Sequence, residues 1–194
     1  MKKALLFLGI IFFSLELGAQ SNDYFKKIER PDFYLGIGTG INTYTGLAGV
    51  SANYLIGKEK YFQAGLGLSM WGYKTSIGFR YDRSNQNGFT YGINLVYSTG
   101  LNDIDLELET SNGDTQEVNM RLNGAGSIGF KTGYNWWIGD KNTFTVTLGY
   151  SVALNKQPWA VKDGSSLSVT SQQVLEILAP GGIILGCSFN FGIQ

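Results

Sequence analysis

Four carboxylates that could bind a cation or a basic group alternate along one short stretch of the chain: Asp103, Asp105, Glu107 and Glu109. Residues 99–117 hold six acidic side chains and no Lys or Arg. Carboxylate oxygens are the ligands that hard divalent cations prefer. We therefore expect this row to interact with such a cation or with a basic protein partner. The alternative is a solvated charged segment, because charge runs usually just keep a segment in water.

A second group of charges consists of Arg80, Asp82 and Lys131. Each stands where large apolar residues alternate with small or polar ones, and each falls on the small and polar side. If these segments are strands of a closed barrel, the three side chains point into its interior, where charges must be paired. We expect them to form a polar cluster in the lumen. The alternative is that they lie near the rims and reach water.

Residues that are absent from the sequence exclude several kinds of site. There is no histidine, so Ser-His catalysis and His-based metal sites are excluded. Cys187 is the only cysteine and cannot form an internal disulfide. Basic and acidic residues number 15 each, which leaves no basic field for a nucleic acid. We expect a protein that is not an enzyme and has no cofactor, the alternative being an enzyme that uses Asp, Ser or Tyr without His.

The segments that would position these side chains read as strands, because large apolar residues recur at every second position. Six segments show this alternation strongly, and they are residues 33–43, 62–70, 89–98, 127–136, 144–152 and 183–193. Two weaker segments, 48–54 and 77–82, bring the number to eight. A few apolar residues fall on the polar side: Leu47, Leu55, Val96, Trp137 and Ile184. The pattern predicts an all-β protein.

The two faces of these strands differ in a way that points to lipid. The small face is dominated by Gly with Ser, Thr, Asn and Gln, where a water-facing surface would carry Lys and Glu. Glycine gains nothing on a solvated strand, but it makes room inside a narrow barrel. The other face is apolar and almost free of charge, with aromatic residues near the strand ends. We predict an antiparallel up-and-down eight-stranded transmembrane β-barrel.

The connections between strands agree with this topology. The predicted turns at 57–60, 83–88 and 139–142 are short, as periplasmic turns of such barrels are. The two long connections, 99–123 and 155–180, both fall on the opposite, external side. The first alternates toward Asn112-Gly113 and predicts a β-hairpin. The second contains an apolar helical stripe in residues 165–178, which would either cap the barrel mouth or dock a partner.

The N-terminus has the three-part pattern of a secretory signal peptide. Lys2 and Lys3 precede an apolar run over residues 4–13, which is too short to span a membrane, and a small-residue cleavage site follows at Ala19. We expect a cleaved signal peptide at 1–19, a periplasmic N-terminal segment at 20–31 and an outer-membrane β-barrel at 32–194. Cleavage removes two lysines and Glu16, leaving 13 basic and 14 acidic residues.

The signal peptide, the eight alternating segments and the aromatic final strand Phe189-Asn190-Phe191-Gly192-Ile193-Gln194 resemble the small outer-membrane barrels of the OmpA/OmpX-like and PorT-type families. The chain ends on Gln194 where such strands usually end on an aromatic residue, while Phe189 and Phe191 keep the aromatic character. The resemblance implies a place in the cell outer membrane, in contact with its lipid and lipopolysaccharide, and insertion by the barrel-assembly machinery.

Three functions are compatible with such a barrel. The first is a non-enzymatic envelope scaffold or binding protein that meets a protein partner through its external loops, since an eight-stranded barrel with a filled interior has no lumen for solutes. The second is a narrow pore, suggested by the many lumenal glycines. The third, which rests on the PorT-type resemblance, is a subunit of a larger secretion or motility complex.

Overall fold

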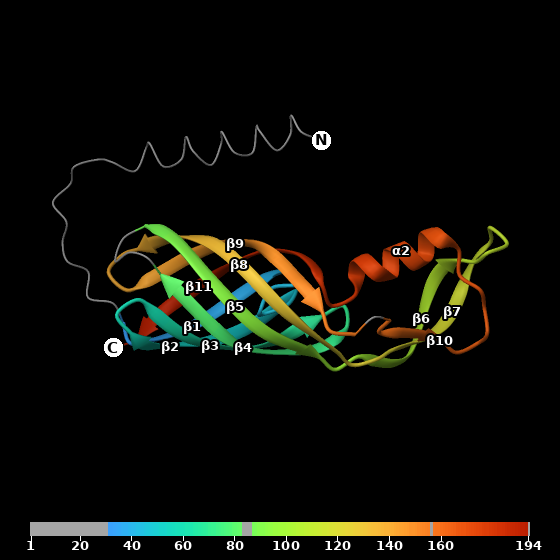
Figure 1. Cartoon of the computed structure of the whole chain (residues 1–194), viewed down its shortest axis with the longest axis horizontal. Helices are drawn as coiled ribbons and strands as arrows, with labels where there is room; N and C mark the ends of the chain where they lie inside the picture. Colours follow the sequence, from blue (N-terminus) through green and yellow to red (C-terminus); the bar gives the residue numbers. More distant parts are fainter. Residues whose placement is uncertain (1–30, 83–86, 156, 194) are drawn as a thin grey trace, which may run out of the picture.

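The computed structural model describes residues 31–82, 87–155 and 157–193. These form a closed β-barrel and a smaller module that projects from one end of it (Figure 1). The predicted signal peptide and nearly all of the predicted N-terminal segment lie outside the described residues, as does most of the predicted turn at 83–88.

Antiparallel strands close the barrel in the order β1, β11, β9, β8, β5, β4, β3, β2, which confirms the predicted eight-stranded fold. Their bounds are β1 Phe33–Ile41, β2 Ala48–Gly57, β3 Lys60–Ser69, β4 Gly72–Asp82, β5 Gly88–Ser98, β8 Ala125–Ile138, β9 Asn142–Ala153 and β11 Gly182–Ile193. Each predicted strand is present. The weaker segment at 77–82 is the second half of β4, which begins earlier, at Gly72.

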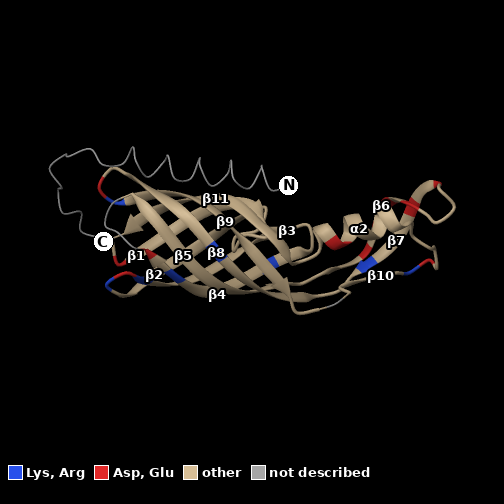
Figure 2. Cartoon of the chain, turned by 45° about the horizontal axis from the view of Figure 1, so that its top comes forward, with Lys and Arg blue, Asp and Glu red and all other residues tan. Residues whose placement is uncertain are grey.

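In the barrel, the alternation of residue types places apolar side chains on the outer wall and small or polar side chains in the lumen. Leu66 on β3 and Ile77 on β4 are exposed on the outer wall, whereas Gln63 and Ser76 on the same strands are buried in the lumen. Most of the described Lys, Arg, Asp and Glu residues lie at the barrel ends and in the module (Figure 2). No helix among the described residues is long and apolar enough to cross a membrane.

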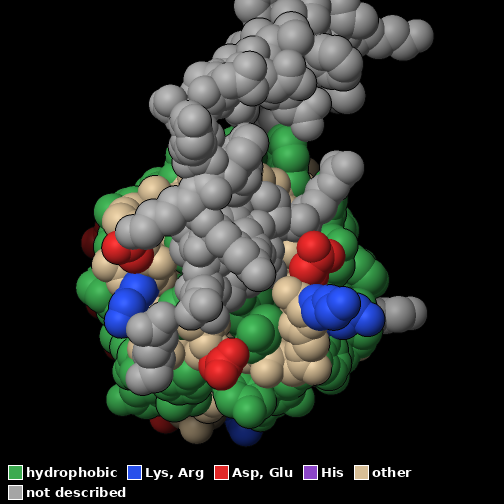
Figure 3. All heavy atoms as spheres, turned by 90° about the vertical axis from the view of Figure 1, so that its left-hand side faces the viewer, with side chains coloured by type: hydrophobic (Ala, Val, Ile, Leu, Met, Phe, Trp, Pro, Cys, Tyr) green, Lys and Arg blue, Asp and Glu red, His purple; other side chains and the backbone are tan. Residues whose placement is uncertain are grey.

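One end of the barrel carries both the start of β1 and the end of β11, because Phe33 pairs with Ile193. The connections from β2 to β3 and from β8 to β9 are also at this end, and both are short, as predicted. Seen from this end, charged side chains lie around the rim and apolar side chains form much of the surrounding wall (Figure 3). If the chain is a membrane barrel of the predicted orientation, this is its periplasmic end.

The module at the other end is built from the two long connections. The first forms the hairpin of β6 (Leu101–Glu109) and β7 (Thr115–Leu122), and the second adds β10 (Trp159–Val161) to β7 and then forms helix α2 (Val169–Leu178). The predicted hairpin and the predicted helical stretch are both present. Side chains from both connections share one apolar core: Val118, Met120, Leu167 and Leu175.

The helix begins and ends where its sequence indicates. The hydroxyl of Ser168 accepts a hydrogen bond from the backbone N–H of Ser171, which satisfies one of the free donors at the start of a helix. Pro180 follows directly after the C-cap residue Ala179. The chain then turns through Gly181 and Gly182, both with positive φ, and enters β11.

A second apolar cluster joins the module to the barrel. Trp71, in the turn between β3 and β4, is buried with Leu122 at the end of β7 and with Ala179 after α2. The indole Nε1 of Trp71 donates a hydrogen bond to the carbonyl oxygen of Asn123 at 3.0 Å. This contact anchors the hairpin to the rim of the barrel.

Candidate functional site

The connection between β1 and β2, at the end of the barrel that carries the module, folds inward and occupies part of the lumen. Thr43, Tyr44 and Thr45 are at most 5% exposed. The hydroxyl of Ser76, on the barrel wall, donates to the carbonyl oxygen of Tyr44 at 2.7 Å, and Thr43 Oγ1 donates to the carbonyl oxygen of Gly46 at 2.9 Å. We call residues 42–47 the plug loop. The alternation predicted a strand as far as residue 43, but β1 ends at Ile41, and residues 42 and 43 belong to the loop; only residues 44–47 were left as a link between two strands.

Lumenal glycines make the space that the plug loop occupies. A Cβ on Gly65 would lie 2.6 Å from the carbonyl oxygen of Tyr44, and one on Gly38 would lie 2.6 Å from Thr45 Oγ1. A Cβ on Gly67 would collide with the carbonyl oxygen of Thr45. The strand glycines thus admit a loop backbone as well as a few large side chains.

The three charged residues predicted to face the lumen are all buried within it. Arg80 and Asp82 form an ion pair, with Arg80 Nε and Nη2 each 2.9 Å from a carboxylate oxygen. Lys131 Nζ instead donates to Gln63 Oε1 at 2.7 Å and lies 4.0 Å from the centroid of the Tyr44 ring. Arg80 also lies over the ring of Tyr61, 5.0 Å from its centroid. Of these contacts, the one between Lys131 and Tyr44 joins the barrel wall to the plug loop, and the others link residues of the wall itself.

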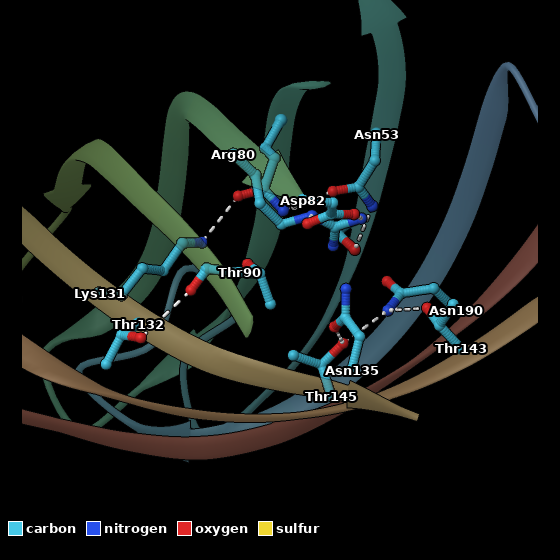
Figure 4. Close-up of polar contacts among 12 residues, drawn as sticks. Asn53, Arg80, Asp82, Thr90, Lys131, Thr132, Asn135, Thr143, Thr145 and Asn190 are labelled. Atoms are coloured by element: carbon cyan, nitrogen blue, oxygen red, sulfur yellow. Dashed lines mark hydrogen bonds and ion pairs between the residues drawn. The ribbon is translucent and has the colours of Figure 1, made fainter. Parts of the chain in front are cut away.

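Amide and hydroxyl side chains also line the lumen (Figure 4). Gln63 Nε2 donates to Asn53 Oδ1 at 2.5 Å, and Thr145 Oγ1 donates to Asn135 Oδ1 at 2.6 Å. Asn190 Nδ2 donates to Thr143 Oγ1 at 3.2 Å. These partners lie on neighbouring strands and link β2 to β3, β8 to β9 and β9 to β11.

A small cavity lies among these groups. A cavity bounded by Tyr44, Arg80 and Lys131 offers only about 10 Å³ to the centre of a water molecule. That is room for about one water.

Lys74 is a fourth lumenal charge, and sequence reasoning missed it. It is 3% exposed on β4 and faces Ser98 on β5. The predicted strand began at residue 77, so Lys74 was left in a connection. Extending the alternation of Arg80, Gly78 and Ser76 by one step would have placed it on the inward face.

The four alternating acids of the external hairpin lie on β6, and three of them are held within the module. Asp103 forms an ion pair with Lys162, Asp105 Oδ1 accepts a hydrogen bond from Asn119 Nδ2 at 2.8 Å, and Glu109 Oε2 accepts one from the hydroxyl of Ser168 at 3.0 Å. Glu107 stands directly opposite Glu117 of β7.

The described residues contain no group of three or more His, Cys, Asp or Glu side chains that could hold a metal ion. The geometry therefore does not support the cation alternative for this row, because its carboxylates are spread along a strand and do not converge. A basic protein partner stays a prediction.

No family model matches the sequence, and comparison with curated proteins finds no match. The resemblance to the OmpA/OmpX-like and PorT-type barrels is therefore one of architecture. Among solved structures the chain is similar to the NanC porin in a rhombohedral crystal form, at 11% identity and a TM-score of 0.31, over 83% of this chain and 100% of the porin chain. At that TM-score the likeness carries no inference about function. The closed barrel, apolar outside and polar inside, has the architecture of an outer-membrane-type β-barrel.

Proposed function

We propose that the protein is a non-enzymatic barrel of the bacterial outer membrane that binds a protein partner through its external module and serves as an envelope scaffold. The observation that supports this most is the shared core of the module, in which β7 contributes Val118 and Met120 and α2 contributes Leu175. Loops that only close a barrel need no core of their own. A packed module on the rim offers a fixed surface to a partner.

The proposed location follows from the outer wall and the N-terminal sequence. Exposed Leu, Ile, Val and aromatic side chains cover the barrel, and in water such a surface would aggregate. Outer-membrane lipid and lipopolysaccharide would surround this wall, after signal-peptide cleavage and insertion by the barrel-assembly machinery. With no histidine in the sequence, Ser-His chemistry is not available to this barrel, which favours a non-enzymatic role.

The test is removal of the module. The hairpin and the helix share one core, so deleting either connection alone would expose the other, and both should be replaced together by short Gly-Ser turns. We expect the shortened barrel to keep its heat-modifiable mobility on gels, because its strands close on themselves. Affinity capture from detergent-solubilised membranes should lose the specific partners of the full chain. If the same partners are still captured by the shortened barrel, the module is not the binding surface.

A gated narrow pore is the second candidate, and the plug loop is the observation that favours it. Part of the lumen is occupied by this loop, which can move without breaking the barrel. Stable unit conductance steps of the purified protein in planar bilayers would support a pore and contradict the scaffold proposal. The capture experiment also tests the third candidate, since a set of mutually interacting partners would indicate a subunit of a larger complex.

A further inference from the structure

A cleft of about 430 Å³ separates the module from the rim of the barrel. One wall is the outer end of β9 with Asn155 and residues 157–159, and the other is α2 with the turn at 179–182. Figure 1 shows α2 rising from the rim beside the end of β9. The proposed function does not use this cleft, because a protein partner would meet the outer surface of the module.

The cleft combines two kinds of lining. Trp159 and Tyr150 contribute aromatic surface, and Gln157, Gln172 and Glu176 contribute hydrogen-bonding groups. Side-chain amides both donate and accept hydrogen bonds, and a carboxylate accepts several. Sugars present hydroxyl groups that donate and accept, together with flat faces of C–H groups that pack on aromatic rings. A mixed lining of this kind therefore suits a carbohydrate better than a purely apolar ligand.

Several of these polar groups have hydrogen-bonding capacity to spare. Gln172 Nε2 donates to the carbonyl oxygen of Leu167 at 3.1 Å, which leaves its Oε1 as an acceptor. Asn155, which also lines the cleft, accepts through Oδ1 from the backbone N–H of Gly126 at 3.0 Å and keeps its NH₂ group as a donor. Gln157 and Glu176 are exposed.

The charge of the described lining limits the chemical class of ligand that the cleft can bind. Glu176 is the one charged side chain among the described residues that line it. A carboxylate repels phosphate, sulfate and other anions but accepts hydrogen bonds from sugar hydroxyls. A neutral sugar fits this lining.

The cleft opens directly beside the lipid-facing wall. Tyr150 on β9 pairs with Ile183 on β11, and both side chains are well exposed on the outer wall, at 59% and 66%. Val152, one step farther along β9, is also exposed. A sugar in this cleft would lie where the chains of a lipid on that wall end.

We propose that the cleft binds the neutral sugar headgroup of an outer-leaflet glycolipid, with its lipid chains against Tyr150 and Ile183. The inference rests on the membrane location in the proposed function, but it does not depend on any protein partner of the module. Gly181 and Gly182 add no side chain beyond Cα to the helix side of the cleft, so a sugar ring can approach the backbone there.

The test uses the full chain in nanodiscs of phosphatidylcholine that contain a small fraction of a synthetic diglucosyl diacylglycerol. Native mass spectrometry counts which lipid stays bound when the disc is stripped. The variant Gln157→Ala/Glu176→Ala removes two exposed cleft groups, and Glu176→Gln keeps the shape of the side chain while removing its charge. Gln173→Ala is the matched control, because Gln173 is exposed on the same helix and does not line the cleft.

We expect the wild type and Gln173→Ala to retain the diglucosyl lipid in preference to phosphatidylcholine. The preference of the double variant for the diglucosyl lipid should be about tenfold lower, because one or two hydrogen bonds are removed. Glu176→Gln should lose less, since the amide still hydrogen-bonds. Unchanged mobility on heat-modifiability gels checks that each variant is folded.

Four results would overturn the inference. One is no preference for the glycolipid, and another is an equal loss in Gln173→Ala. The third is stronger retention of anionic phosphatidylglycerol than of the diglucosyl lipid. The fourth is saturation-transfer NMR showing that the free disaccharide headgroup binds as tightly as the lipid, which would make the cleft a site for soluble sugar. None of these results would change the partners captured by the module, so the inference can fail while the proposed function stands.

Discussion

Lys131 on the barrel wall holds its ammonium group 4.0 Å from the ring centroid of Tyr44 in the plug loop. The two residues come from distant parts of the sequence, and both are buried in the lumen. Their contact joins a buried charge to the plug loop. Removing the contact should therefore lower the stability of the barrel and loosen the closure of its lumen.

We predict that Tyr44→Ala loosens the plug loop and opens the lumen. A buried cation–π contact contributes about 2 kcal/mol, and the lost ring leaves a cavity in addition. Planar-bilayer recordings should show conductance steps that the wild type lacks, and the unfolding midpoint in urea should fall. Tyr54→Ala is the matched control because Tyr54 is 56% exposed on the outer wall. Equal behaviour of the two variants would show that the plug loop does not close the lumen.

A second prediction concerns the lipid-facing wall. Leu66→Arg and Leu148→Arg should each cost roughly 2–4 kcal/mol of folding free energy in a bilayer if they lie near its midplane. Both side chains are exposed on the barrel wall, at 59% and 38%. Folding titrations into lipid vesicles would measure the cost. If arginine is tolerated at both positions, that wall does not face lipid.

A change at the neighbouring inward position should act through a different mechanism. A Cβ on Gly67 would strike the carbonyl oxygen of Thr45, so Gly67→Ala should displace the plug loop. The expected result is faster hydrogen exchange in residues 42–47. Unlike the cost of the arginine substitutions, this effect should not depend on how deep the position lies in the bilayer. Unchanged exchange there would contradict the close packing of strand and loop.

The ion pair in the lumen gives a further prediction. Asp82→Asn leaves the Arg80 guanidinium buried, at 4% exposure, without its carboxylate. Breaking a buried pair from one side costs about 3–5 kcal/mol. The double variant Arg80→Met/Asp82→Leu should recover much of that loss, because no unpaired charge remains. Equilibrium unfolding measures the free energy of unfolding of the two variants. A double variant that is less stable than Asp82→Asn would contradict this prediction.

The module should loosen in acid through Asp163. The N–H and hydroxyl of Ser165, with the N–H of Asn119, hydrogen-bond this carboxylate and hold its pKa below the usual range. Because the folded pKa lies below the unfolded one, the carboxylate stabilises the module above the unfolded pKa. That stabilisation is lost as pH falls through the folded pKa. Asp163 is fully exposed, so we expect a local effect.

Hydrogen exchange of the Asn119 amide measures this opening. In the wild type, the protection of this amide should decrease as the pH is lowered. In Asp163→Asn, its protection should be lower at every pH and should change less with pH. Asp114→Asn changes another exposed acid of the module and serves as the control. If the pH dependence of this protection in Asp163→Asn matches that of the wild type, another group causes the acid sensitivity.

The sequence by itself determined the strands and their two faces. Alternation is a local property, and the side chains at positions such as Leu66 and Gly67 point to opposite sides of any strand they form. The hairpin at Asn112-Gly113 and the helix that ends before Pro180 are likewise encoded by short stretches of sequence. Arg80, Asp82 and Lys131 could be placed on the inward face for the same reason.

Tertiary structure alone decided what those faces contact. The sequence left Tyr44 between two predicted strands, and only closure of the barrel brings it against Lys131 and the glycines that admit it. The acids of β6 could be read as a row, but their partners Lys162 and Ser168 come from the second connection. The cleft likewise joins the end of β9 to α2. Each of these contacts links segments far apart in the chain, and the periodicity of a single segment carries no information about which distant segment it will meet.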